Sequence, residues 1–96
     1  MADYELSDKA DEDLTEIYIF SFQKFGEAKA DAYLLSLNEC FSLLAANPRL
    51  GRKIDHIRQG YFQHEHGRHS IFYRQKINGI TIMRVLHHSM DSVFRL

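Results

Sequence analysis

The segment Asn47-Pro48-Arg49-Leu50-Gly51 divides the chain into two halves with different hydrophobic periods. Proline lacks the amide donor that helix interiors and central strands need, and glycine interrupts regular structure, so this segment predicts a loop. Before the loop, apolar residues recur at the three- and four-residue spacing of helices. After it, they form short runs rich in β-branched and aromatic residues, which favour strands. We therefore expect a single domain over residues 1–96, with a helical half followed by a sheet.

The first half begins with a short predicted strand, Tyr4–Leu6, and then two helices. Ser7 is a good N-cap, and acidic residues follow it in the first turns, where they favour the helix dipole. We expect the first helix to end near Phe25, with Gly26 as its C-terminal cap, and the second to cover residues 27–46. A link as short as Gly26 makes the two helices an antiparallel hairpin. The predicted core stripes are Ala10, Leu14, Ile17, Tyr18, Ser21 and Phe25, then Ala30, Tyr33, Leu34, Leu37, Phe41 and Leu44.

The second half predicts strands at residues 61–65, 70–76 and 80–87. Asn78-Gly79 is a strong signal for a two-residue hairpin turn, and it predicts a register for the last two strands. The pairs expected on the core side are Ile77 with Ile80, Gln75 with Ile82, Tyr73 with Arg84, and Ile71 with Leu86. The pairs expected on the outer face are Ser70 with His87, Phe72 with Val85, and Arg74 with Met83. A bulge in residues 80–87 would exchange the two faces. The resulting fold class is α+β, a helical hairpin on one face of a largely antiparallel sheet.

Charge is distributed unevenly between the halves. Residues 1–48 hold 3 Lys/Arg and 10 Asp/Glu, a net charge of −7, whereas residues 49–96 hold 9 and 3, a net charge of +6. The basic half suits an acidic protein partner or nucleic acid. The chain has no long apolar run, an acidic N-terminus and one cysteine, so we expect a cytoplasmic protein with no membrane span or secretory signal.

An ordered set of motifs runs along nearly the whole chain. It comprises Tyr4-Glu5-Leu6-Ser7, Lys9-Ala10-Asp11-Glu12-Asp13-Leu14, Phe25-Gly26, Asn47-Pro48-Arg49-Leu50-Gly51-Arg52, Ile57-Arg58-Gln59-Gly60-Tyr61, His69-Ser70-Ile71-Phe72-Tyr73-Arg74, and Arg84-Val85-Leu86-His87-His88-Ser89-Met90-Asp91. This combination resembles the RelE/ParE toxin superfamily. The last motif, Arg-x-Leu-His-x-x-Met-Asp, is typical of its ParE branch. The resemblance implies a RelE/ParE-like fold, a toxin that poisons DNA gyrase by binding, and neutralisation by a ParD-like antitoxin.

The related RelE branch consists of ribosome-dependent mRNA interferases, so enzyme and binding protein must be weighed. Ser70 lies where that branch is expected to carry a basic side chain, and the sequence ends Val93-Phe94-Arg95-Leu96, without the terminal Tyr or His of many interferases. We therefore expect a non-enzymatic toxin with no cofactor and no sequence-specific nucleic-acid binding of its own. The alternatives are an interferase that uses Arg74 and His87, and a degenerate toxin that binds only its antitoxin.

Both helices carry more apolar residues than one buried stripe needs, which suggests a covered surface. The residues expected to bind the antitoxin are Ile19, Phe20, Phe22, Ala28, Ala32, Leu35, Arg58 and Arg74. The residues expected to affect target binding or toxicity are His87, Met90 and Asp91, although each also has a purely structural explanation.

Arginine, cysteine and histidine residues of the chain are also expected to have structural roles. Arg84 is predicted to be a buried, paired arginine that pins its strand, and Cys40 a small residue at the core edge. His64, His66, His69 and His87 are possible zinc ligands by residue type, but no cysteine or carboxylate completes the set, so we expect no metal.

Overall fold

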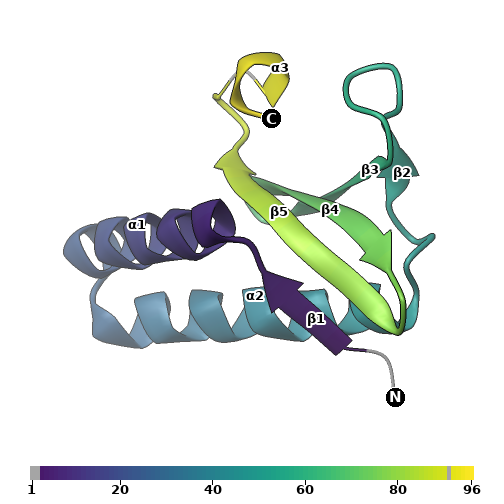
Figure 1. Cartoon of the computed structure of the whole chain (residues 1–96). Coiled ribbons are helices and arrows are strands. Elements are labelled where there is room, and N and C mark those ends of the chain that lie inside the picture. Colours follow the sequence, from purple (N-terminus) through teal and green to yellow (C-terminus); the bar gives the residue numbers. More distant parts are fainter. Residues whose placement is uncertain (1–2, 91) are drawn as a thin grey trace.

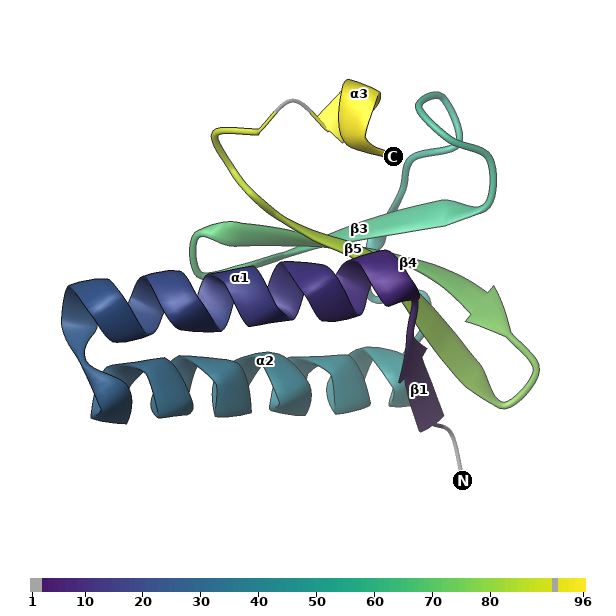
Figure 2. The ribbon, with the colours of Figure 1, turned by 60° about the vertical axis from the view of Figure 1, so that its left-hand side comes forward.

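Two helices pack on one face of a five-stranded sheet, and a short third helix lies on the other face (Figures 1 and 2). The computed structural model describes residues 3–90 and 92–96. Its elements are β1 (Asp3–Leu6), α1 (Asp8–Phe25), α2 (Glu27–Ala46), β2 (Arg52–Lys53), β3 (Tyr61–His66), β4 (His69–Lys76), β5 (Gly79–His87) and α3 (Ser92–Arg95). The strand order is β1-β5-β4-β3-β2, with β1 parallel to β5 and the other pairs antiparallel. The predicted α+β architecture is confirmed, whereas β2 and α3 were not predicted.

The ends of the helical hairpin follow from local chemistry, as expected. The Ser7 hydroxyl accepts a hydrogen bond from the Ala10 amide at 3.0 Å and donates one to the Met83 carbonyl at 2.8 Å. It therefore caps α1 and also ties the start of α1 to β5. At the other end, Gly26 has a φ of 90°, and its amide donates to the Phe22 carbonyl at 2.9 Å.

The tip of the hairpin projects past the sheet (Figure 2), so not every predicted core residue on α1 is covered. Phe25 was expected in the core stripe, but its side chain is 47% exposed. The prediction was wrong for this residue because helical periodicity identifies a face and not where the opposite layer ends.

The sheet separates two apolar clusters. The larger lies between the sheet and the hairpin and contains Ala10, Leu14, Leu37, Cys40, Phe41, Leu44, Ala45, Phe62, Ile71, Tyr73, Ile80, Ile82 and Val85. The smaller, which we call the outer cluster, contains Ile54, Tyr61, Phe72 and Leu86, with Ile57, Met83 and Leu96 packed against them. The sheet is thus apolar on both sides, and the C-terminal segment covers part of its outer face.

The register predicted for β4 and β5 was wrong. Lys76 pairs with Gly79, so the turn consists of Ile77 and Asn78, and Ile77 is 89% exposed instead of facing Ile80. Asn78 supplies the positive φ of 65° that the turn requires. Gly79 is the first residue of β5 and lies directly against β1, where an added side chain would collide with the main chain of Asp3. Parallel pairing with β1, which local turn signals do not report, thus places the glycine inside the strand.

A bulge then exchanges the faces of β5, as the sequence allowed. Tyr73 pairs with Ile82 but Phe72 pairs with Arg84, so β5 contains one extra residue at this point. Beyond the bulge Val85 joins the core under the hairpin and Leu86 joins the outer cluster, the reverse of the predicted sides. The prediction that Tyr73 faces Arg84 was also wrong.

Candidate functional site

The outward face of the helical hairpin carries large apolar side chains in contact with solvent. Ile19 and Phe22 on α1 and Leu35 on α2 are 47–59% exposed, and Ala28 and Ala32 are also exposed. Residues at i and i+3 share one flank of a helix, which places Ile19 and Phe22 on the same side of α1. We call these five residues the hairpin stripe.

The remaining residues predicted to bind the antitoxin lie elsewhere. Phe20 is 57% exposed, but the Lys24 ammonium lies 5.5 Å from its ring, and its position next to Ile19 turns it to another flank of α1. Arg58 and Arg74 lie on the outer face of the sheet, 5.5 and 5.8 Å from the ring of Tyr61. Five of the eight residues are thus exposed on the helical hairpin, and the other three lie in two further places.

Asp13 and Arg84 join α1 to the bulge of β5. Arg84 Nε and Nη2 donate to the Asp13 carboxylate at 2.8 and 2.9 Å, and the Val85 amide donates to it at 3.0 Å. Arg84 Nη1 also donates to the Arg95 carbonyl at 2.7 Å, so the same guanidinium holds α3. The hydrogen bond to Asp13 raises the pKa of Arg84 above its ordinary value. The expectation of a paired arginine is confirmed, with Asp13 as the partner, and the Arg84 side chain is partly buried.

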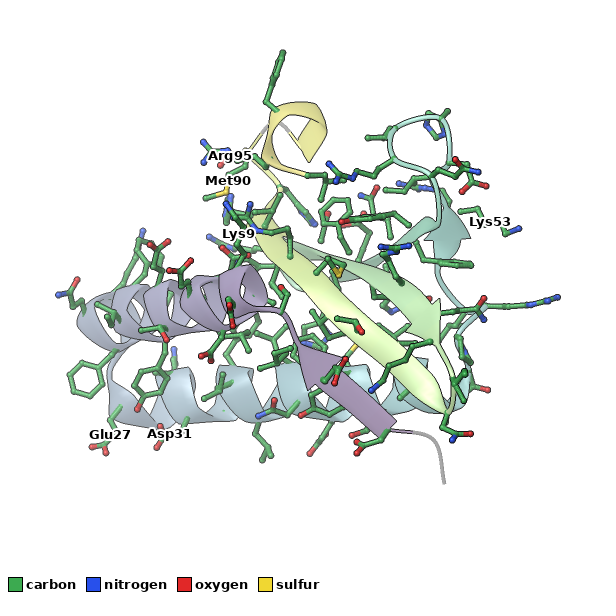
Figure 3. The ribbon with its side chains drawn as sticks, in the orientation of Figure 1. Lys9, Glu27, Asp31, Lys53, Met90 and Arg95 are labelled. Atoms are coloured by element: carbon green, nitrogen blue, oxygen red, sulfur yellow. The ribbon has the colours of Figure 1, made fainter. Side chains whose placement is uncertain are left out.

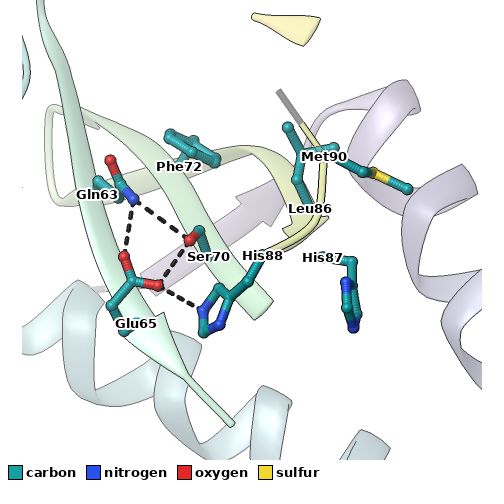
Figure 4. A pocket seen from close by; sticks show the side chains of 8 residues that line it. All are labelled: Gln63, Glu65, Ser70, Phe72, Leu86, His87, His88 and Met90. Carbon is teal, nitrogen blue, oxygen red and sulfur yellow. Dashed lines mark hydrogen bonds and ion pairs between the residues drawn. The ribbon is translucent and has the colours of Figure 1, made fainter. Parts of the chain in front are cut away.

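A pocket of about 370 Å³ opens on the outer face of the sheet where β5 ends. Figure 4 shows its polar group, the Glu65 carboxylate, which accepts from Gln63 Nε2 at 2.7 Å, Ser70 Oγ at 2.6 Å and His88 Nε2 at 2.7 Å. Phe72 and Leu86 are buried beneath the pocket, and Met90 lines it from the segment after β5. Among the described residues that line it, none is arginine or lysine.

Glu65 is ionised at neutral pH because its neighbours favour the charged form. Burial by itself raises the pKa of the carboxyl, but the hydrogen bonds from Ser70, Gln63 and His88 together lower it below its ordinary value. About half of the Glu65 side chain remains exposed, so this negative charge is available to a partner.

The residues predicted to act on a target are placed near this pocket but do not form one group. His87 was expected on the outer face, but the bulge turns its ring toward His69 on the helix side, with the ring centroids 5.4 Å apart. His87 Nδ1 also accepts from the Ser89 amide at 3.1 Å, which orients the turn after β5. Met90 is 40% exposed and lies with Arg95 where β5 leads to α3 (Figure 3). Asp91 lies outside the described residues.

Two further histidines connect the β3–β4 hairpin to α2. His66 Nε2 lies 2.9 Å from the Ser36 hydroxyl, and His69 Nδ1 lies 2.6 Å from the Tyr33 hydroxyl. Burial is the main reason that the pKa of His69 falls to about 4, with His87, His88 and His66 adding to the shift. Over residues 3–90 and 92–96, no group of three or more His, Cys, Asp or Glu side chains is placed to hold a metal ion. Cys40 is buried, which raises the pKa of its thiol.

Sequence reasoning missed the Glu65 network and the partner of Arg84. Glu65 and His88 are 23 residues apart, and Asp13 and Arg84 are 71 apart, so no local period connects them. One signal was present, because Glu65 is one of only three acidic residues in the basic half of the chain.

Comparison with known proteins identifies the family. The family model described as the ParE toxin of type II toxin–antitoxin systems matches residues 4–92. The chain belongs to the ParE toxin family. This match confirms the resemblance seen in the motifs.

Curated ParE relatives match this chain along most of their length. Toxin ParE1 of Mycobacterium tuberculosis (strain H37Rv) is 42% identical over 89 residues, which cover 92% of this chain and 91% of the relative. Toxin ParE1 of Caulobacter vibrioides is 35% identical over 92 residues, covering 96% and 95%. A solved structure of the chromosomal ParDE toxin–antitoxin system from P. aeruginosa superposes with a TM-score of 0.76 and 26% identity, covering 91% of this chain and 96% of that chain.

The ParE fold seen here contains no helix, over the described residues, that is long and apolar enough to cross a membrane.

Proposed function

We propose that this ParE-family protein is the toxin of a toxin–antitoxin pair, that a ParD-like antitoxin neutralises it, and that it poisons DNA gyrase by binding. The observation that carries the proposal is the hairpin stripe, an uncovered apolar surface on a protein whose family is defined by toxin–antitoxin pairs. The similarity to a ParDE structure supports an antitoxin of the ParD type.

The hairpin stripe has the chemistry of a helix-binding surface. Its apolar side chains come from two antiparallel helices joined only by Gly26, and helical spacing places Ala28, Ala32 and Leu35 on one flank of α2, as it places Ile19 and Phe22 on one flank of α1. An amphipathic helix would bury them with anchors at i, i+3, i+4 and i+7. Basic residues on α1 and α2 are few, whereas Arg58 and Arg74 offer cations on the outer face for a more distant, acidic part of the same partner.

Action by binding is supported by what the outer face offers for catalysis. Cleavage of an RNA phosphodiester needs a base, an acid and a cation for the developing negative charge. The pocket has a carboxylate and an imidazole in contact, but no arginine or lysine is among the lining residues that the structure describes. The residues of the interferase alternative are not brought together: Arg74 lies over the ring of Tyr61, whereas His87, at the edge of the pocket, packs its ring against His69.

The test of the proposed activity measures gyrase and ribosomes side by side. Purified toxin is assayed for inhibition of DNA supercoiling and for trapped, cleaved DNA, with and without the antitoxin, and for cleavage of ribosome-bound mRNA. We expect loss of supercoiling or trapped DNA, reversed by the antitoxin. Cut mRNA with fully active gyrase would contradict the proposal and establish the interferase alternative.

The test of the antitoxin surface uses matched exposed residues. The double substitution Ile19→Glu and Leu35→Glu places charges in the hairpin stripe and should weaken antitoxin binding at least roughly a hundredfold, because buried apolar anchors carry most of the energy of such interfaces. Ile77→Glu is the control, since Ile77 is exposed at the β4–β5 turn, away from the hairpin. Equal affinity of the double variant and the control, by titration calorimetry, would remove this surface from the proposal.

A further inference from the structure

The pocket at Glu65 combines a fixed negative charge with an apolar floor. The carboxylate is oriented by donors from β3, from β4 and from the segment after β5, and it stands beside Phe72 and Leu86 of the outer cluster. Its Oε1 accepts one hydrogen bond and its Oε2 accepts two. A carboxylate has about four acceptor positions, so one remains for a further donor.

We propose that this pocket binds the side chain of an arginine or lysine carried by the toxin's target protein. Such a side chain places its aliphatic stem on apolar surface and its cation against a carboxylate, which is the combination that Met90, Leu86 and Glu65 present. An anionic ligand would meet the Glu65 charge with no compensating arginine or lysine among the described lining residues. An uncharged apolar ligand would cover a charge that water now solvates, at a cost in free energy.

The size and position of the pocket decide between possible occupants. A volume of about 370 Å³ is at the small end for ligand sites and suits one long side chain. The hairpin stripe lies on the opposite side of the sheet, so the antitoxin helix proposed there does not fill it (Figure 2). We therefore assign the pocket to the target. The assignment to the target rests on the proposed function, whereas the binding of a basic side chain does not.

The binding test uses a small probe that needs neither gyrase nor antitoxin. N-acetyl-arginine methylamide is titrated into the ¹⁵N-labelled toxin, beside the citrulline analogue, which replaces the guanidinium by a neutral urea of the same shape. We expect saturable shifts of the amides of Gln63, Ser70 and His88, with the arginine compound binding roughly fivefold more tightly, as a half-exposed ion pair allows. Equal binding of the two compounds, or shifts confined to other parts of the chain, would overturn the inference.

Two carboxylate variants make the test specific. Glu65→Gln removes the charge in the pocket and should erase the preference for arginine over citrulline. Glu5→Gln is the matched control, because Glu5 is an exposed carboxylate on β1 that pairs with Lys76 far from the pocket. Met90→Ala should weaken both compounds to a similar extent, since it removes apolar surface and no charge. An arginine preference that survives Glu65→Gln, or that disappears in Glu5→Gln, would show that the site is elsewhere.

The assignment to the target is tested with the same variants in the supercoiling assay. Glu65→Gln should need roughly fivefold more toxin than the unsubstituted protein, while Glu5→Gln should match it. If Glu65→Gln inhibits gyrase as well as the control does, the target does not use the pocket. If the unsubstituted toxin leaves gyrase unaffected, the proposed function fails, and the probe titration still decides whether the pocket binds a basic side chain.

Discussion

Removing the Asp13 carboxylate should destabilise this protein more than any change on its surface. Asp13 accepts both hydrogen bonds of the bidentate pair with Arg84 and a third from the Val85 amide, and it joins α1 to the bulge of β5. In Asp13→Ala the guanidinium keeps its bond to Arg95 but loses its counter-charge in a site where its side chain is only 17% exposed.

The magnitude follows from how buried the pair is. Breaking a buried pair by removing one partner costs about 3–5 kcal/mol, and the partial exposure of Arg84 places the expected loss near 3 kcal/mol. A domain of this size has a free energy of unfolding of roughly 5–15 kcal/mol, so the loss is a large fraction of it. The melting temperature should fall by roughly 12–24 °C.

The assay is urea denaturation followed by circular dichroism, applied to Asp13→Ala, Arg84→Met and the double variant. The double variant should be more stable than Asp13→Ala alone, because it no longer buries a cation without its partner. Unchanged slopes of free energy against urea would show that the variants differ in stability and not in compactness. A loss below about 1 kcal/mol for Asp13→Ala, or strictly additive losses in the double variant, would refute the reasoning.

Three further predictions concern the pKa of His69, the Tyr73 hydroxyl and the contact of Gly79 with β1. Because the folded-state pKa of His69 is about 4, below the ordinary 6.5, the unfolded chain binds more protons between these pH values, so stability should fall as pH drops through this window. The expected loss is about 1–2 kcal/mol after allowance for solvent screening, and His69→Gln should flatten the pH dependence of urea midpoints. Tyr73→Phe removes the hydroxyl that accepts from the Gly51 amide at 2.8 Å and should cost about 1–3 kcal/mol in the same denaturation assay; an unchanged midpoint would contradict this. Gly79→Ala should cost more than about 1 kcal/mol and increase amide hydrogen exchange in β1, because its methyl group would collide with the main chain of Asp3; protection equal to that of the unsubstituted protein would show that β1 tolerates the methyl group.

Elements whose causes are local could be predicted from the order of the residues alone. Ser7 caps the first helix through its own hydroxyl, Gly26 ends it at a positive φ, and Pro48 follows the end of the second helix. These effects act over three or four residues, so the helix bounds were predicted almost without error. The ordered motifs likewise sufficed to recognise the ParE family.

The facing of β5 and the composition of the sites depend instead on contacts between segments far apart in the chain. The bulge lies where Arg84 and Val85 donate to Asp13, a residue of a helix about 70 residues earlier in the chain. It reversed the expected sides of Leu86 and His87, and with them the composition of the outer face. The pocket at Glu65 also depends on contacts between distant segments, because the donors to its carboxylate come from three segments that become neighbours only when the sheet forms. Hydrogen bonds and packing between distant segments leave no period in the sequence, and they are what determines the register and the sites of this protein.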